Sequence, residues 1–300
     1  MGVDLGVNIL GLKLENPFIL ASGILGTSAK LFERVEEAGA AAIVTKSISI
    51  EPRNGYELPI VAEVEYGLIN CVGLANPGYR ALIDEIESAN VKIPIIVSIF
   101  GENVKDYGFL AKKLSDYADA FELNISCPHA KVSEFLSNAK VVEKIAREVK
   151  QNTDLKFSVK IGLLCNLKEI VKACMNYANA ITAINTVPAM KINTEFFKPI
   201  LSNKFGGLSG PAIKYIAVKA VYDIYENCEG KLEVVGCGGI MNAYDAIEFM
   251  LAGAKALEIG TGIYYKGLSI FENLCKDVEE FLKQHKIQKI SEIVGRAHDC

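Results

Sequence analysis

The chain has 300 residues, of which 50% are hydrophobic and 23% are charged, as is typical of a folded globular protein. This composition excludes a disordered chain, a collagen-like protein and a small disulfide scaffold. The 32 Lys and Arg residues against 36 Asp and Glu residues give a formal net charge of −4, so no basic surplus favours nucleic acid, whereas a local pocket for a small anionic metabolite stays open.

Apolar segments rich in β-branched residues alternate along the chain with segments of helical periodicity. Eight of the apolar segments are predicted to be strands: Pro17–Ser22, Ala42–Ser47, Pro94–Ile99, Ala120–Asn124, Lys156–Ile161, Ala180–Asn185, Leu232–Gly236 and Ala256–Gly260. Eight strand–helix units predict an α/β protein closed into a TIM (β/α)8 barrel, with an open doubly wound sheet as the alternative. One domain over residues 1–300 is expected, because no Pro/Ser-rich linker or charge block divides the chain.

Two connections are too long to be simple turns: Ile48–Ile93 after the second strand and Thr186–Gly210 after the sixth. Both follow the carboxyl end of a strand, where barrel enzymes place their chemistry. We therefore expect these two insertions to form a lid or a wall at the active site.

The stretch Asn124-Ile125-Ser126-Cys127-Pro128-His129 follows the fourth strand. A thiol there has three possible roles: a general base, a nucleophile or a small buried residue. The position after a strand end and the polar neighbours favour a chemical role. His129, two residues further along the chain, is less suited to act on Cys127 directly.

Lys46 and Lys160 each end an apolar strand. A lysine there is rarely buried without a partner, although its stem can be buried while its ammonium reaches water. Two such lysines at two strand ends favour cations held over an anionic ligand or over negative charge that develops in a reaction.

Glycine-containing loops, Val235–Ile240 and Glu258–Gly262, follow the last two strands. Glycines allow backbone amides to approach a phosphate, and barrels often bind phosphate at this place. Neither loop is a GxGxxG after a first strand, and no GxxxxGK[ST] is present, so Rossmann and P-loop folds lack support.

Asparagines lie in the first insertion (Asn70–Gly78), after the fourth strand (Asn124) and after the sixth (Asn185-Thr186). Asn-Pro-Gly is also ordinary turn chemistry. An amide both donates and accepts, so three of them facing one pocket would suit an imide or ureido edge. No His, Asp and Glu cluster has metal spacing, so no metal is expected, and no Ser/His/Asp pattern is present.

The eight cysteines include no pair separated by two residues, which disfavours a zinc knuckle or an iron–sulfur cluster on this chain. Residues 1–16 lack a long apolar block, and apolar runs such as Ala38–Val44 are far shorter than the roughly 18 residues that span a bilayer. A cytoplasmic protein with reduced thiols and no membrane segment is expected.

Taken together, these segments resemble class 1 dihydroorotate dehydrogenase, most closely the catalytic subunit of its class 1B branch. The similarity covers nearly the whole chain. The segments that carry it are Asn16-Pro17-Phe18, Ala21-Ser22-Gly23, Thr45-Lys46-Ser47, Asn70–Gly78, Asn124–Pro128, Val159-Lys160, Asn185-Thr186, Gly207–Pro211, Gly238-Gly239 and Gly260-Thr261. The resemblance implies a barrel that holds one FMN at the carboxyl ends of its strands and oxidises (S)-dihydroorotate to orotate in pyrimidine biosynthesis.

The resemblance also implies roles for single residues. Cys127 is the base that removes the proton from substrate C5, hydride passes from C6 to flavin N5, and Lys160 stabilises the reduced ring near N1 and O2. The residues implied in FMN binding are Ser22, Lys46, Ser47, Ser98, Asn124, Lys160, Ile184, Gly210, Gly238, Gly239, Gly260 and Thr261. Those implied in substrate binding are Lys46, Asn70, Cys71, Val72, Gly73, Leu74, Asn124, Asn185 and Thr186.

Class 1B further implies a homodimer core and a second subunit that carries FAD and a [2Fe–2S] cluster and passes electrons to NAD, in a heterotetramer. The sequence departs from the family pattern at His129, at Ser98 and at Ile161-Gly162-Leu163-Leu164. These departures concern the fine geometry of the substrate and the flavin contact of Ser98.

The sequence does not fix the electron acceptor, so NAD and fumarate both remain possible. Three alternatives to the function itself also remain at this point. The first is a dihydropyrimidine dehydrogenase-like reductase of uracil or thymine, although the charge of Lys46 favours a carboxylated substrate. The second is a non-redox, phosphate-binding barrel lyase or isomerase with Lys46 or Lys160 as a Schiff-base lysine. The third is a catalytically idle binding subunit, which the presence of Cys127 and both lysines disfavours.

Overall fold

The computed structural model describes residues 2–125, 138–163 and 166–299, and all structural statements below refer to these ranges. Eight parallel strands close into a barrel in the order β10-β15-β16-β3-β4-β7-β8-β9. They are β3 (Phe18–Leu20), β4 (Ala42–Val44), β7 (Ile95–Ile99), β8 (Ala120–Asn124), β9 (Phe157–Ile161), β10 (Ala180–Ala183), β15 (Glu233–Cys237) and β16 (Ala256–Ile259). The predicted TIM barrel is confirmed, and only β15 extends beyond its predicted segment, by the single residue Cys237.

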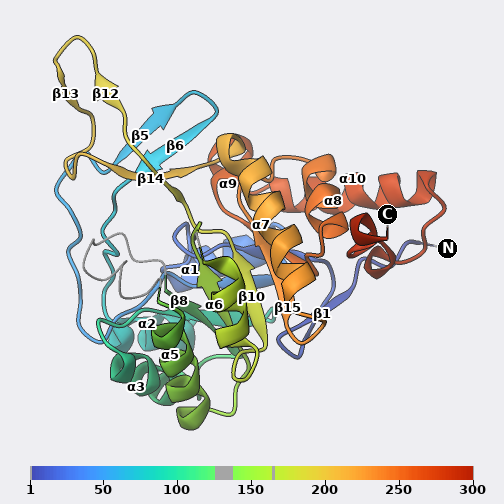
Figure 1. Ribbon diagram of the computed structural model, residues 1–300, viewed down its shortest axis with the longest axis horizontal. Helices are drawn as coiled ribbons and strands as arrows, with labels where there is room; N and C mark the ends of the chain where they lie inside the picture. Colours follow the sequence, from blue (N-terminus) through green and yellow to red (C-terminus); the bar gives the residue numbers. More distant parts are fainter. Residues whose placement is uncertain (1, 126–137, 164–165, 300) are drawn as a thin grey trace.

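Helices cover the outside of the barrel (Figure 1). They are α1 (Ala29–Glu37), α2 (Tyr79–Ser88), α3 (Val104–Leu114), α5 (Ala139–Asn152), α6 (Leu167–Cys174), α7 (Lys214–Asn227), α8 (Ala243–Leu251), α9 (Thr261–Lys266) and α10 (Ile270–Gln284), with short 3₁₀ helices at Pro211–Ile213, Ile290–Ile293 and Arg296–His298. Each long helix buries an apolar stripe; in α5 the spacing of Val142, Ile145 and Val149 places all three against the core. Within the described residues, none of the helices is long and apolar enough to cross a membrane.

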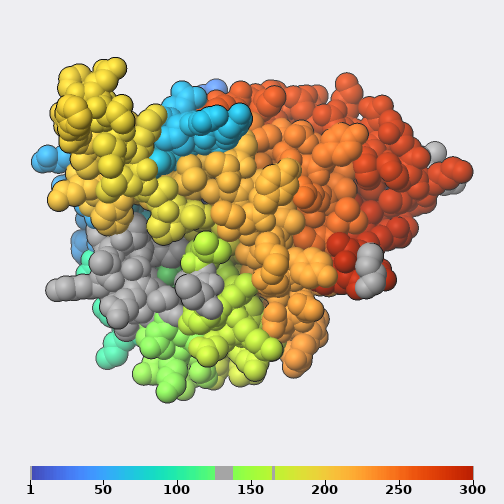
Figure 2. Space-filling view, turned by 45° about the horizontal axis from the view of Figure 1, so that its top comes forward, coloured from blue at the N-terminus to red at the C-terminus, as the bar shows by residue number. Residues whose placement is uncertain are grey.

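The remaining strands lie outside the barrel. A hairpin of β1 (Val7–Ile9) and β2 (Leu12–Leu14) precedes the first barrel strand. The two long connections contribute β5 (Val61–Val64), β6 (Gly67–Asn70), β11 (Val187–Ala189) and β14 (Gly206–Ser209), which form one antiparallel sheet in the order β11-β14-β6-β5. The pairing of β14 with β6 therefore joins the two connections to each other. Beyond that sheet, the pair β12 (Ile192–Asn193) and β13 (Lys198–Pro199) stands out from the body in yellow, beside the light-blue β5 and β6 (Figure 2).

Buried polar residues are concentrated on the barrel strands. Ser98 on β7, Glu122 and Asn124 on β8, Ser158 and Lys160 on β9, Thr182 on β10 and Glu258 on β16 are all buried. A purely structural barrel interior is filled mainly by Val, Ile and Leu. This polar content therefore indicates that the strand ends serve a site as well as the core.

Helix α3 begins with a capping box. The Asn103 side chain accepts hydrogen bonds from the N–H groups of Lys105 and Asp106 at 3.0 and 3.3 Å, and Asp106 accepts one from the Asn103 N–H at 3.2 Å. Asn103→Ala is expected to lower the free energy of unfolding by about 1 kcal/mol, measured by urea denaturation. The matched control is Ser28→Ala at the start of α1, where the side chain makes no capping hydrogen bond and the loss should be much smaller. Equal losses in the two variants would contradict this role for the cap.

Candidate active site

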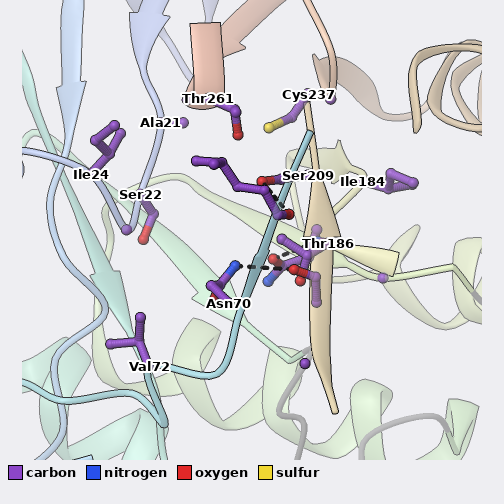
Figure 3. Close-up of a pocket in the computed structure, with 18 of the residues that line it drawn as sticks. Ala21, Ser22, Ile24, Asn70, Val72, Ile184, Thr186, Ser209, Cys237 and Thr261 are labelled. Carbon is purple, nitrogen blue, oxygen red and sulfur yellow. Dashed lines mark hydrogen bonds between the residues drawn. The ribbon is translucent and has the colours of Figure 1, made fainter. Parts of the chain in front are cut away.

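A cavity of about 650 Å³ lies at the carboxyl ends of the barrel strands, and both long connections contribute to its walls. Its volume is in the range of small-molecule and cofactor sites. In the close-up, Ser22 and Ile24 lie on one side of the cavity and Ile184 and Thr186 on the other, with Thr261 and Cys237 at the top (Figure 3). The barrel thus places polar residues from distant parts of the sequence around one space.

Most residues selected from the sequence line this cavity. They are Ser22, Lys46, Ser47, Asn70, Cys71, Val72, Gly73, Leu74, Asn124, Lys160, Ile184, Asn185, Thr186, Gly210, Gly238, Gly239, Gly260 and Thr261. Ser98 does not line it: the residue has no exposed surface, and its hydroxyl lies 2.9 Å from that of Ser47. Cys127 and His129 lie outside the described residues.

A row of hydrogen bonds fixes the polar groups at the ends of the neighbouring strands β3, β4, β7 and β8. The Ser47 hydroxyl lies 3.2 Å from that of Ser22 and accepts a hydrogen bond from the Asn124 amide at 2.9 Å. The Tyr107 hydroxyl in turn donates to the backbone carbonyl of Asn124 at 2.9 Å. Ser98 supports this row from below through Ser47, so the orientation of the Asn124 amide is set before any ligand binds.

The wall opposite this row depends on a close approach between the two connections. The Asn70 side chain donates to the Gly207 carbonyl at 3.3 Å, and Gly207 is the partner of Asn70 in the register of β14 and β6. A Cβ at position 207 would overlap the Thr186 side chain, so only glycine allows Thr186 to occupy this place. The Thr186 N–H donates to the Asn185 side chain at 2.8 Å, which orders this pair at the cavity edge.

Backbone loops with little side-chain bulk form another part of the cavity. Gly239 has a φ of +79°, and a Cβ there would lie 2.8 Å from the Gly210 carbonyl oxygen. The loop after β15 therefore packs directly on the loop that precedes Pro211, with the loop at Gly260 and Thr261 nearby in the same lining. Such a surface lets backbone groups approach a phosphate closely.

Lys46 brings a cation to the cavity. Burial lowers the pKa of its ammonium, and it makes no ion pair with any residue in the described ranges. Its positive charge is therefore available to an anionic ligand, which would restore the favourable environment that burial removes.

The second lysine, Lys160, is held in a cluster of charged residues at the floor of the cavity. Its ammonium contacts the carboxylate of Glu258 closely and lies 3.5 Å from an oxygen of Glu122. Burial alone would lower the pKa of Lys160, but the two carboxylates outweigh it and raise that pKa. Burial first and the charge of Glu258 second raise the pKa of Glu122 well above its ordinary value. The neighbouring Cys237 thiol has a pKa raised to about 12, chiefly by burial, so it stays neutral.

Glu122, Glu258 and Gly207 were not predicted as single functional residues from the sequence. The signal for the two acids is present in Phe121-Glu122-Leu123 and Leu257-Glu258-Ile259, since a carboxylate inside an apolar strand is as unusual as the lysine at its end. Their meeting with Lys160 depends on barrel closure, which the local sequence does not show. In the described residues, no group of three or more His, Cys, Asp and Glu is arranged to hold a metal.

The fold and the cavity define a TIM-barrel protein with a cavity of ligand-binding size at the carboxyl ends of its strands. The family model described as dihydroorotate dehydrogenase matches residues 4–282. The chain is 44% identical to the "Dihydroorotate dehydrogenase B (NAD(+)), catalytic subunit" of Pyrococcus abyssi over 297 residues, which are 98% of this chain and 99% of the relative. It is 41% identical to the protein of the same name from Methanocaldococcus jannaschii, covering 98% of each. The chain belongs to the dihydroorotate dehydrogenase family.

Comparison with solved structures supports the fold separately. The crystal structure of DHODH from Eimeria tenella in complex with ferulenol matches with a TM-score of 0.86. The match covers 99% of this chain and 89% of that one at 21% sequence identity. At this sequence identity, the structural similarity supports the barrel fold alone.

Proposed function

We propose that this chain is an FMN-dependent catalytic subunit that oxidises (S)-dihydroorotate to orotate in pyrimidine biosynthesis. The observation that carries the proposal is the convergence of Lys46, Asn70, Asn124 and Asn185 on one cavity whose floor contains Lys160. The family match over residues 4–282 and the names of relatives that align along nearly their whole length support it.

The residues present fit FMN. The glycine loops offer the close approach that a phosphate needs, and the Ser47–Asn124 row and Lys160 offer donors to a polar ring edge. The residues proposed to hold FMN are Ser22, Lys46, Ser47, Asn124, Lys160, Ile184, Gly210, Gly238, Gly239, Gly260 and Thr261, with Ser98 acting through Ser47. When bound, FMN supplies the acceptor for a hydride, and the protein supplies binding, orientation and charge.

The substrate is proposed to bind against the wall made by the two long connections. Its carboxylate would pair with the Lys46 ammonium, and its ring amide groups would meet the amides of Asn70, Asn124 and Asn185. The backbone at Cys71, Val72, Gly73 and Leu74 and the Thr186 hydroxyl complete this set. Cys127 is proposed as the base at substrate C5 on the grounds of the Asn124–Pro128 sequence, just after the end of β8.

Lys46→Met is expected to weaken the binding of orotate by about 10–100-fold, because a hydrogen bond to a charged group contributes about 1.5–3 kcal/mol. The pKa of Lys46 is lowered by burial, so wild-type affinity should fall as the pH rises through that lowered pKa, whereas the variant should lack this dependence. Calorimetric titration with orotate at saturating FMN measures both effects. Equal affinity of the two proteins at neutral pH would contradict the assignment.

The route of the electrons after the flavin is also proposed. The relatives are named as NAD(+)-linked catalytic subunits, which supports a partner subunit that carries FAD and a [2Fe–2S] cluster, around a homodimer core in a heterotetramer. Unpaired cysteines at 71, 174, 228, 237 and 275 suit a reducing compartment, so we place the protein in the cytoplasm. We also infer one FMN-binding domain over residues 1–300, because the cavity draws on strands from β3 to β16.

The experiment that tests the function compares two substrates in anaerobic stopped-flow reduction of the FMN-loaded protein. Dihydroorotate is expected to reduce the flavin much faster than dihydrouracil, because only dihydroorotate carries the carboxylate for Lys46. Faster reduction by dihydrouracil would instead favour a reductase of uracil or thymine. Trapping of a carbonyl substrate by borohydride, without any flavin reduction, would instead support the lyase or isomerase.

A further inference from the structure

Three ionisable side chains that are almost wholly removed from water meet at the floor of the cavity: Lys160 and Glu258 line it, and Glu122 contacts Lys160 without lining the cavity. The side chains of Lys160, Glu122 and Glu258 are 5%, 1% and 2% exposed. Glu122 lies on β8, next to the lysine strand β9, whereas Glu258 lies on β16, three strands away around the closed barrel. The contact between Lys160 and Glu258 therefore crosses the barrel interior.

The charges of these three side chains do not cancel if all three are ionised. Two carboxylates and one ammonium leave one negative charge in a site with almost no access to water, which is strongly unfavourable. The two acids also differ in geometry: Glu258 contacts the ammonium closely, whereas Glu122 is 3.5 Å away. In the described part of the chain, neither oxygen of the Glu122 carboxyl group has a hydrogen-bond partner.

We propose that Glu122 holds a proton in the folded protein and that Glu258 is the positioning residue that keeps the Lys160 ammonium at the cavity floor. The cluster then has one ammonium, one carboxylate and one neutral carboxylic acid, so its net charge is zero. The titratable groups that face Glu122 are Lys160 from β9, Glu258 from β16 and Cys237 from β15, while its register neighbours Ser98 and Ser158 carry no charge. The raised pKa of Glu122, caused by burial and by Glu258, agrees with this arrangement.

The proton on Glu122 has a consequence for ligands, which rests on the proposed function. Dihydroorotate and a reduced flavin are anions, and a floor with net charge −1 would repel them. With Glu122 neutral, the floor holds the ion pair of Lys160 and Glu258, which has no net charge. Ionisation of Glu122 at high pH would give the floor a net charge of −1 and weaken the binding of anionic ligands. The residues that touch the ligand would be unchanged.

The first test measures unfolding of the full-length protein against pH at a fixed excess of FMN, with Glu122→Gln as the variant. Below the ordinary Glu pKa of 4.5, the carboxyl is protonated in both the folded and the unfolded state. Above it, the unfolded chain loses this proton and the folded protein keeps it, so rising pH favours unfolding of the wild type. The wild-type unfolding constant should therefore grow about tenfold per pH unit relative to Glu122→Gln, until the folded pKa is reached.

The matched control is Thr182→Val, a change at the register neighbour of Lys160 on β10 that alters no ionisable group. Its unfolding constant should keep the wild-type dependence on pH. A ratio of wild type to Glu122→Gln that stays constant with pH would overturn the proposal.

The second test does not depend on the folding of one variant. Infrared spectra at neutral pH should show the carbonyl band of a protonated carboxylic acid in the wild type and none in Glu122→Gln. The band should also be lost in Glu258→Gln, where Glu122 is intact, because Glu122 becomes the sole carboxylate beside Lys160 and ionises. Survival of the band in either variant, or its absence from the wild type, would overturn the proposal.

These readings are separate from the proposed function. A protein that shows the carboxylic acid band and the tenfold dependence, yet does not oxidise dihydroorotate, would refute the function and keep the cluster. A protein that oxidises dihydroorotate but lacks the carboxylic acid band would support the function and refute the proposal for the cluster.

Discussion

Replacement of Cys127 by alanine is expected to slow the reduction of bound FMN by dihydroorotate by about 10²–10⁴-fold, which is the usual contribution of a general base. Removal of the C5 proton is the step that needs a base, and no other protein group is proposed for it. The affinity for FMN should be unchanged, because Cys127 is not among the residues proposed to hold it. Anaerobic stopped-flow reduction gives the rate, and fluorescence titration gives the affinity.

The control for this variant is Cys275→Ala on α10, a partly buried cysteine that does not line the cavity. It should reduce FMN at the wild-type rate. Reduction at the wild-type rate by Cys127→Ala would show that another group is the base and would remove the central chemical assignment made from the sequence.

Replacement of Lys160 by alanine is expected to lower the free energy of unfolding at neutral pH by about 3–5 kcal/mol, the effect of removing one partner of a buried ion pair. The change leaves the buried carboxylate of Glu258 without a cation beside the protonated Glu122, so Glu258 also stays in the barrel only by binding a proton. The loss should therefore shrink as the pH falls. The same variant should lower the midpoint potential of the bound flavin, since a positive charge that stabilises the reduced ring is gone.

The control is Lys219→Ala, whose lysine is 70% exposed in an ion pair with Asp223 on α7. Such a surface pair contributes about 0.3–0.5 kcal/mol, so this variant should be nearly as stable as the wild type. If Lys160→Ala were as stable as Lys219→Ala, the ion pairs of Lys160 would not stabilise the fold. An unchanged flavin midpoint potential would count against the role of Lys160 in catalysis.

The barrel could be predicted from the sequence because parallel strands that are buried on both faces appear as continuous apolar runs. Ile95–Ile99 and Phe157–Ile161 are examples, and both begin one residue inside their predicted segments. The cavity residues could be predicted for a related reason. A lysine or an asparagine at the end of such a run is unusual in an apolar core, and Lys46 and Asn124 both line the cavity.

The features that could not be predicted all depend on contacts between distant segments. The pairing of β6 with β14 joins residues about Ile69 and Leu208, and nothing local in either connection specifies that register. Glu258 meets Lys160 only because eight strands close into a ring. The family resemblance implies a flavin contact for Ser98, but its side chain is wholly buried against Ser47, and a direct flavin contact stays untested.

The most direct test is an anaerobic titration of the purified chain with dihydroorotate, followed through the visible spectrum. We expect a yellow protein that bleaches in proportion to added dihydroorotate, with release of FMN on denaturation. Later addition of NAD should restore the colour only when the electron-transfer subunit is present. A yellow protein that stays oxidised with dihydroorotate, or a colourless one that does not take up FMN, would contradict the proposed function.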